Sequence, residues 1–170
     1  MLILRTAKHL SELREDAVIA TGSKRRAFQL LKLRPDLQII NIRGNVDTRL
    51  RKMEEQQLDG IVLAAAGLKR LGMEDVITQY LAPEDMISAP AQGALALEVR
   101  EDQKELQKML DVFCDEETMN EVCAERNFLE QMGGSCHTPA GARCQKTDQG
   151  YELYAMFGNE DGSKQAYTKV

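Results

Sequence analysis

Hydrophobic and polar positions follow two different periods in the first half of the chain. Short apolar runs at 17–21, 37–42 and 61–64 have the length and the β-branched content of buried strands. The stretches that follow Ser23 and Asn45 place apolar residues at helical spacing, and both residues are good N-caps. Strands that alternate with helices predict βαβ units and a mainly parallel sheet.

The pattern changes in the second half. A helix at 65–71 follows the third strand of the first half, and helices are expected in the second half at 103–112 and 116–132. A strand is predicted at 94–99, and residues 151–157 alternate as a second strand does. Asp161 and Gly162 then form a hairpin turn before a returning strand at 164–170. We therefore predict an α/β fold, a βαβ-type domain with a mainly parallel sheet followed by part of a small α+β domain.

Composition and charge narrow the functional classes. The chain has a net charge of −5, only 5% aromatic residues and no apolar run near the ~20 residues of a membrane helix, so neither a nucleic-acid nor a membrane partner is expected. The cysteines lack the CxxC spacing of a metal or redox site and indicate reduced thiols in a cytoplasmic protein. Cys114 and Cys123 are expected to be packing residues, and the role of Cys144 stays open.

Basic residues are concentrated in one part of this acidic chain. Residues 23–70 hold 11 Lys and Arg against 5 Asp and Glu. Arg25 and Arg26 begin a helix, where the dipole disfavours cations, and Arg43 follows the next strand. Ligands of open parallel sheets bind beyond the carboxyl ends of the strands, so these positions favour a polyanion site. Guanidinium groups suit carboxylates in particular. The alternative is a solvated helix face with scattered charge.

Cys136 follows two glycines at the end of the longest predicted helix. Gly133 is a natural helix C-cap, so the helix dipole would not lower the pKa of this thiol. The side chain of His137 is adjacent in sequence but need not face the thiol, so a Cys–His pair is a weak interpretation. A thiol together with an arginine-rich cleft favours covalent attachment of a polyanionic ligand, and an inert loop cysteine remains the alternative.

Several specific motifs occur in order between residues 17 and 141. They are Thr21-Gly22-Ser23-Lys24-Arg25-Arg26, Arg43-Gly44-Asn45-Val46 with Thr48-Arg49-Leu50, Ala64-Ala65-Ala66-Gly67-Leu68-Lys69-Arg70-Leu71-Gly72, Gln92-Gly93-Ala94-Leu95, and Glu125-Arg126-Asn127-Phe128-Leu129 before Gly133-Gly134-Ser135-Cys136. These motifs resemble those of the hydroxymethylbilane synthase family, also called porphobilinogen deaminase. Small departures occur before the paired arginines and after the cysteine, where the family usually has Thr-Ser-Ser-Leu and Gln-Val-Pro.

The resemblance implies a transferase of tetrapyrrole biosynthesis, the pathway to porphyrins and heme. Such enzymes condense four molecules of porphobilinogen, with loss of ammonia, into hydroxymethylbilane on a dipyrromethane cofactor. A thioether at the cysteine matching Cys136 holds this cofactor. The other implied cofactor-binding residues are Thr21, Ser23, Arg25, Arg26, Arg43 and Gly44. The implied substrate-binding residues are Arg49, Arg70 and Gln92.

The resemblance also implies how the chain divides. Residues 1–93 correspond to an arginine-lined second domain of periplasmic-binding-protein-like fold, 94–112 to a returning strand and helix of a first domain, and 113–170 to part of a C-terminal cofactor-attachment domain. The family's acid–base aspartate, in a Leu-Lys-Asp segment, has no match here. We therefore assign no catalytic residue and expect the chain alone to be inert.

Two further expectations concern assembly and the main alternative. The resemblance implies a monomeric parent enzyme, but the strand at 94–99 has lost its sheet and is expected to self-associate or to be locally disordered. The alternative function is a non-enzymatic binding module for a polycarboxylate, which would keep its ligand affinity without Cys136.

Overall fold

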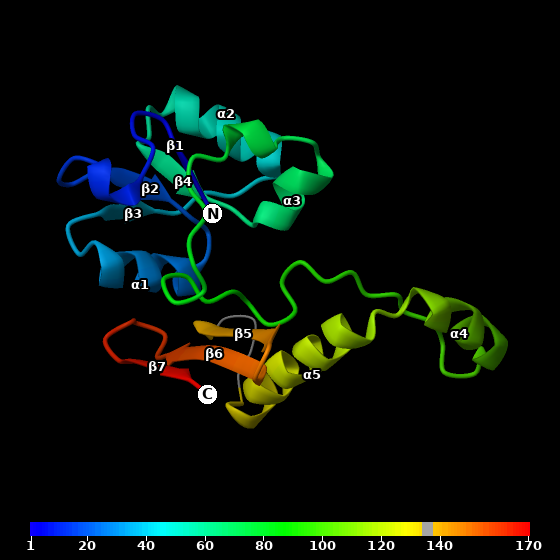
Figure 1. Ribbon diagram of the computed structural model, residues 1–170. Helices are drawn as coiled ribbons and strands as arrows, with labels where there is room; N and C mark the ends of the chain where they lie inside the picture. Colours follow the sequence, from blue (N-terminus) through cyan, green and yellow to red (C-terminus); the bar gives the residue numbers. More distant parts are fainter. Residues whose placement is uncertain (134–137) are drawn as a thin grey trace.

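The computed structural model describes residues 1–133 and 138–170. Its first part contains a four-stranded sheet with the order β1-β4-β2-β3 (Figure 1). The strands are β1 (Leu2–Leu4), β2 (Val18–Ala20), β3 (Gln38–Ile40) and β4 (Gly60–Val62). β2 is parallel to both β3 and β4, which confirms the predicted parallel sheet, whereas β1 pairs antiparallel with β4 at the edge. β1 was not predicted from the sequence.

Helices follow the three parallel strands as predicted. They are α1 (Lys24–Leu33), α2 (Val46–Glu55) and α3 (Ala65–Arg70), with short 3-10 helices at η1 (Leu10–Glu12) and η2 (Glu74–Val76). The side chain of Ser23 accepts a hydrogen bond from the Arg26 N–H at 3.4 Å, and Asn45 accepts one from the Thr48 N–H at 2.8 Å. Both predicted N-caps are therefore confirmed.

The sheet is packed on both faces, because successive strand residues point to opposite sides. Ile61 joins the buried cluster on the side of α2 and α3, and its neighbour Val62 joins the cluster on the side of α1 and η1. Ile19 and Leu30 are fully buried in this second cluster. The body is thus a three-layer α/β arrangement, and its tight core fixes the loops that leave β2 and β3.

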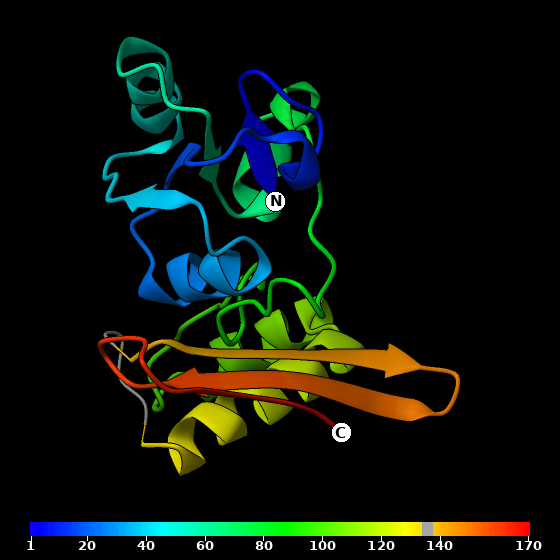
Figure 2. The same cartoon turned by 90° about the vertical axis from the view of Figure 1, so that its left-hand side faces the viewer.

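The second part of the chain contains an antiparallel sheet and a long helix. The elements are α4 (Lys104–Leu110), η3 (Asp111–Phe113), α5 (Glu116–Gln131), β5 (Ala140–Thr147), β6 (Gly150–Gly158) and β7 (Gln165–Lys169). The sheet has the order β5-β6-β7, and α5 packs along one of its faces (Figure 2). The hairpin at Asp161 and Gly162 is confirmed. β5 was not predicted.

The predicted strand at 94–99 is wrong. These residues have irregular backbone and no strand pairing in the described part of the chain, and Leu97 is 63% exposed. A strand needs neighbours that satisfy its backbone groups, and none of the described strands pairs with this segment. The predicted helix at 103–112 is present as α4 and η3, which extend away from the rest of the molecule (Figure 1). Self-association or local disorder of this segment stays a prediction.

Two interpretations of the cysteines are also wrong. Cys114 and Cys123 are exposed rather than packed in a core, because they lie on surfaces that no other described element covers. Cys144, which was left open, is buried on β5. Among the described residues, no helix is both long and apolar enough to cross a membrane.

Candidate functional site

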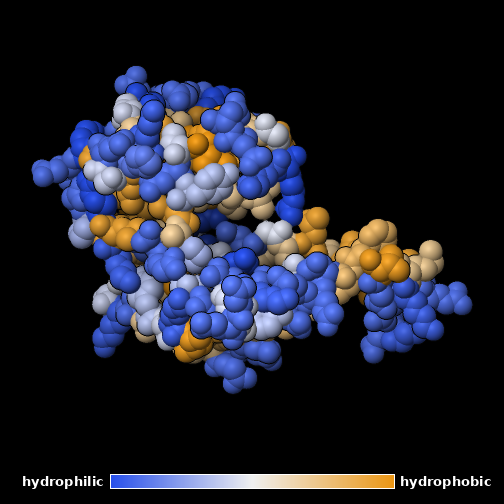
Figure 3. All heavy atoms as spheres, viewed as in Figure 1, coloured by the Kyte–Doolittle hydropathy of each residue, from blue (hydrophilic) through white to orange (hydrophobic). Residues whose placement is uncertain are grey.

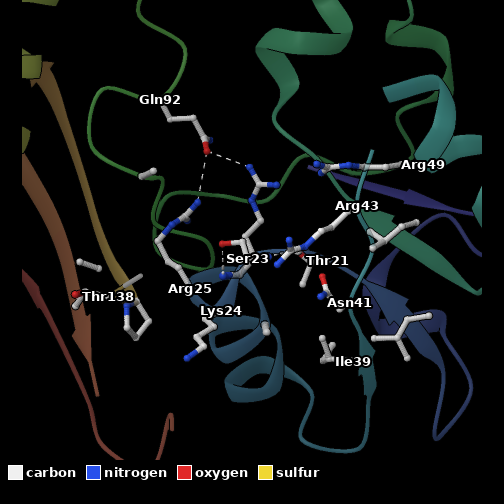
Figure 4. Close-up of a pocket in the computed structure, with 18 of the residues that line it drawn as sticks. Thr21, Ser23, Lys24, Arg25, Ile39, Asn41, Arg43, Arg49, Gln92 and Thr138 are labelled. Atoms are coloured by element: carbon white, nitrogen blue, oxygen red, sulfur yellow. Dashed lines mark hydrogen bonds between the residues drawn. The ribbon is translucent and has the colours of Figure 1, made fainter. Parts of the chain in front are cut away.

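A cavity of about 1260 Å³ lies between the body of the first sheet and the C-terminal sheet (Figure 4). The loops that follow β2 and β3 form one wall, and residues 138–140 and Leu129 belong to the other. Ala89, Pro90 and Gln92, in the segment that joins the two parts, complete the lining among the described residues. Seven predicted site residues line this cavity: Thr21, Ser23, Arg25, Arg26, Arg43, Arg49 and Gln92.

Two predicted residues, Gly44 and Arg70, do not line the cavity. Gly44 adopts a φ of +132°, and its carbonyl accepts a hydrogen bond from Arg49 Nε at 2.7 Å. A Cβ at Gly44 would lie 2.7 Å from the Thr48 methyl group, so glycine is required by the turn itself. Arg70 Nη2 donates to the Gly93 carbonyl at 2.8 Å, outside the lining. Cys136 lies outside the described residues.

Arg25 is the most deeply buried cation of the site, with 6% of its surface exposed. One guanidinium nitrogen, Nη1, donates to the Ile87 carbonyl, and Nη2 lies 3.4 Å from Gln92 Oε1. Burial first, and the neighbouring Arg26 second, lower the pKa of Arg25 to about 9. At neutral pH the group is therefore a poorly solvated cation, which a bound anion would stabilise.

Arg26 lies beside it and shares one acceptor. Its Nη1 donates to the Val62 carbonyl at 3.2 Å, and its Nη2 donates to Gln92 Oε1 at 3.0 Å. Burial and then the charge of Arg49 lower the pKa of Arg26. The amide oxygen of Gln92 thus faces two guanidinium groups (Figure 4). A single neutral oxygen leaves both positive charges without a counter-charge.

The described part of the chain offers the cluster no acidic partner. Within residues 1–133 and 138–170, none of the ion pairs involves Arg25, Arg26, Arg43 or Arg49, and the cavity lining of described residues contains no Asp or Glu. Lys24 adds a further cation to the same lining. Guanidinium forks bind carboxylates with two parallel hydrogen bonds. The arrangement can therefore bind a ligand that carries several carboxylates.

The hydroxyl groups of the site are also available to a ligand. Thr21 Oγ1 accepts the Ser23 N–H at 3.2 Å, and Ser23 Oγ accepts the Arg26 N–H at 3.4 Å. Each hydroxyl accepts in these bonds and keeps its own hydrogen, which can donate to an anion. No group of three or more His, Cys, Asp or Glu side chains in the described residues could hold a metal ion.

Sequence reasoning missed two buried polar residues that support the site. Glu125 accepts the Ala91 N–H at 2.6 Å and the Cys144 N–H at 2.8 Å, and burial raises the pKa of its carboxyl. Gln29 is 1% exposed and is bonded to the backbone of Ile87. Glu125 stands in one of the recognised motifs and Gln29 one helical turn after Arg25, but neither position reveals its partner.

The fold and the cleft together define a mixed α/β protein with an arginine-lined site suited to a polycarboxylate ligand. Comparison with known protein families shows which family of this class the chain belongs to. Residues 1–108 match the family described as "Porphobilinogen deaminase, dipyromethane cofactor binding domain", and residues 119–170 match "Porphobilinogen deaminase, C-terminal domain". The chain belongs to the porphobilinogen deaminase family.

Curated relatives agree with this assignment. The chain is 52% identical over 167 residues to the porphobilinogen deaminase of Lachnospira eligens, an alignment that covers 96% of this chain and 57% of the relative. It is 46% identical over 165 residues to that of Clostridioides difficile, covering 96% of this chain and 55% of the relative. The chain therefore spans about half the length of the curated relatives that it matches.

Proposed function

We propose that this chain supplies the carboxylate-binding cleft and the cofactor-attachment region of a hydroxymethylbilane synthase. The whole enzyme is a transferase that condenses four molecules of porphobilinogen into hydroxymethylbilane. The observation that carries the proposal is the cavity that gathers Arg25, Arg26, Arg43 and Arg49 without a carboxylate partner among the described residues. Every pyrrole ring of this chemistry bears an acetate and a propionate group, which is the charge pattern that such a cleft requires.

The donor set of the cleft fits dipyrromethane. Two pyrrole rings carry four carboxylates, and Arg25, Arg26 and Arg43 offer guanidinium donors to them. The hydroxyls of Thr21 and Ser23 add neutral donors. When bound, dipyrromethane supplies the primer to which substrate units are added. We assign its thioether bond to Cys136, whereas the exposed Cys123 lies on α5 outside the cavity lining.

The incoming porphobilinogen is assigned to the outer part of the same cluster. The Gly44 carbonyl orients Arg49 through its Nε, so that the two terminal nitrogens of the guanidinium remain for a substrate carboxylate. Gln92 would yield its place between Arg25 and Arg26 to a charged oxygen. Arg70 is assigned to substrate binding through its contact with the segment after Gln92. No acid–base residue is assigned in this chain.

The division of the chain is proposed on the same basis. Residues 1–93 form an arginine-lined domain of periplasmic-binding-protein-like fold, 94–112 form an irregular segment and a helix that return to another domain, and 113–170 belong to the C-terminal domain. The exposed apolar residues of 94–112 support this division. The whole enzyme is proposed to be a cytoplasmic monomer with no nucleic-acid or membrane partner.

Intact-mass measurement tests the covalent role of Cys136. The chain is incubated with porphobilinogen, both alone and together with the N-terminal part of the Lachnospira eligens relative. We expect a two-pyrrole adduct only when both pieces are present, and no adduct on Cys136→Ser, with Cys123→Ser as the matched control. An adduct that persists in Cys136→Ser would refute the assignment.

Calorimetry distinguishes the alternative, a non-enzymatic polycarboxylate-binding module. Such a module would bind porphobilinogen with unchanged affinity after Cys136→Ala, and the two-piece mixture would produce no hydroxymethylbilane. If the chain is part of the proposed enzyme, the two-piece mixture should produce hydroxymethylbilane and the chain alone should produce none.

A further inference from the structure

The segment that joins the two parts of the molecule, residues 87–92, is bonded to both of them. The Ser88 carbonyl accepts the Ala142 N–H of β5 at 3.0 Å, and the Ser88 hydroxyl donates to the Ala142 carbonyl at 3.3 Å. Glu125 of α5 accepts the Ala91 N–H. We call residues 87–92 the connector. The position of the connector therefore sets the position of the cleft side chains that are bonded to it, such as Arg25.

Gln29 bonds the connector to α1. Its Oε1 accepts the Ile87 N–H at 2.7 Å, and its Nε2 donates to the Ile87 carbonyl at 3.1 Å. The side-chain amide thus pairs with one residue of the connector much as a neighbouring strand would. Nε2 also donates to the Arg25 carbonyl at 3.2 Å, which ties the contact to the first turn of α1. All of these bonds are buried, where unpaired groups are costly.

The Ile87 carbonyl is also an acceptor for the guanidinium of Arg25. The aliphatic stem of Arg25 is confined on its other side, since a Cβ at Gly141 would lie 3.0 Å from Arg25 Cδ and 2.9 Å from the Ser88 carbonyl oxygen. With the stem enclosed, the direction of the guanidinium depends on where the Ile87 carbonyl lies. Gln29 fixes that carbonyl, although Gln29 itself does not line the cavity.

We propose that Gln29 is a positioning residue of the carboxylate site, which holds the Ile87 carbonyl so that Arg25 presents Nη2, the nitrogen that faces Gln92, to the cleft. The assignment of a carboxylate ligand rests on the proposed function, but the effect of Gln29 on Arg25 is a property of the chain without ligand. A residue that only fills the core would change stability and leave the environment of Arg25 unchanged.

The first test is made without ligand, by proton–nitrogen NMR of the arginine side chains in the 170-residue chain. The signal of Arg25 is assigned with Arg25→Lys. We expect it to be shifted and slow to exchange in the unmodified chain and in the exposed control Gln56→Met, which lies at the end of α2. In Gln29→Met, which keeps the length of the side chain but loses both bonds to Ile87, the Arg25 signal should move to the position of exposed arginines. An unchanged Arg25 signal in folded Gln29→Met overturns the proposal.

A second variant covers the case in which Gln29→Met does not fold. Gln29→Glu retains an acceptor for the Ile87 N–H but places a carboxylate oxygen against the carbonyls of Ile87 and Arg25. We expect a folded protein in which the Arg25 signal is displaced and exchanges faster. The same signal as in the unmodified chain contradicts the proposal.

Titration with porphobilinogen then separates this inference from the proposed function. We expect Gln29→Met to weaken binding about tenfold, the value of roughly one lost charge-assisted hydrogen bond, and Gln56→Met to leave it unchanged. If the unmodified chain fails to bind porphobilinogen, the proposed function is at fault, and the NMR result still decides the role of Gln29. A folded Gln29→Met that binds as tightly as the unmodified chain overturns the proposal.

Discussion

The α/β body and the segment at 94–113 are both rich in aliphatic residues, yet only the body buries them. Ile19 and Ile61 are completely buried between two layers of helices, whereas Leu97 is 63% and Phe113 is 74% exposed. Apolar side chains gather on and beside α4, which extends from the molecule (Figure 3). Periodicity therefore identifies the element that a segment can form, but burial of its apolar face requires another element to pack against it.

Backbone pairing explains why the α/β body and the segment at 94–113 differ so much in burial. β2 has hydrogen-bonded neighbours on both sides, β3 and β4, so its short length of three residues is sufficient. The backbone of 94–99 has no paired strand within the described residues and remains irregular. An apolar segment therefore forms a strand where paired strands lie on both sides of it, and it stays irregular where they do not.

Core truncation gives the largest expected contrast. Ile19→Ala should lower the free energy of unfolding by about 2–4 kcal/mol, because it removes buried methyl groups and leaves a cavity. Leu97→Ala, at an exposed position, should change it by less than about 0.5 kcal/mol. Urea unfolding followed by circular dichroism measures both. Equal losses for the two variants would show that 94–99 is packed in solution and would remove the contrast.

The arginines should show a comparable contrast in binding. Arg25→Gln should weaken the affinity for porphobilinogen about 10- to 100-fold, since a buried charge-assisted hydrogen bond contributes about 1.5–3 kcal/mol. Arg100→Gln is the matched control in the exposed segment, where the guanidinium is 3.4 Å from Asp102. The Arg100→Gln variant should bind porphobilinogen as tightly as the unmodified chain. Isothermal titration calorimetry distinguishes the two, and a loss of affinity in Arg100→Gln would mean that the segment belongs to the site.

Raising the pH should weaken the same binding by a smaller factor. Burial lowers the pKa of Arg25 to about 9, so this cation is half deprotonated near that pH. An anionic ligand prefers the protonated form, and its affinity should therefore fall progressively as the pH rises through about 9 and level off at neutral pH. In Arg25→Gln this fall should be absent. Identical pH profiles for both proteins would exclude Arg25 as the group that titrates.

Much of the body and of its site follows from local signals. The strand before Ser23, the cap itself and the helix after it are close in sequence, so their pattern predicts them. The convergence of Arg25, Arg43 and Arg49 in one cavity follows from the rule that parallel strands end at the same edge of a sheet. These predictions needed no information about distant contacts.

The parts that were missed depend on distant partners. β1 has only three residues, and its pairing with β4 lies some 60 residues away in sequence. β5 has no regular alternation and is fixed by its pairing with β6, for example Arg143 beside Tyr154. Gln29 bonds to Ile87, which is 58 residues away, so the pattern around Gln29 cannot reveal a supporting role.

Helix capping provides the smallest contrast between the two regions. Asn45 caps α2 through a 2.8 Å bond from the Thr48 N–H, whereas Gln103, at the same position before α4, makes no such side-chain bond. Asn45→Ala should therefore lower the free energy of unfolding by about 1 kcal/mol, and Gln103→Ala should leave it unchanged. Asn45 also follows Gly44 and the turn that orients Arg49, so weaker porphobilinogen binding should accompany the loss of stability. Unfolding and titration of the same two variants measure both effects. If Gln103→Ala were the more destabilising change, α4 would contribute to the folded core despite its exposure.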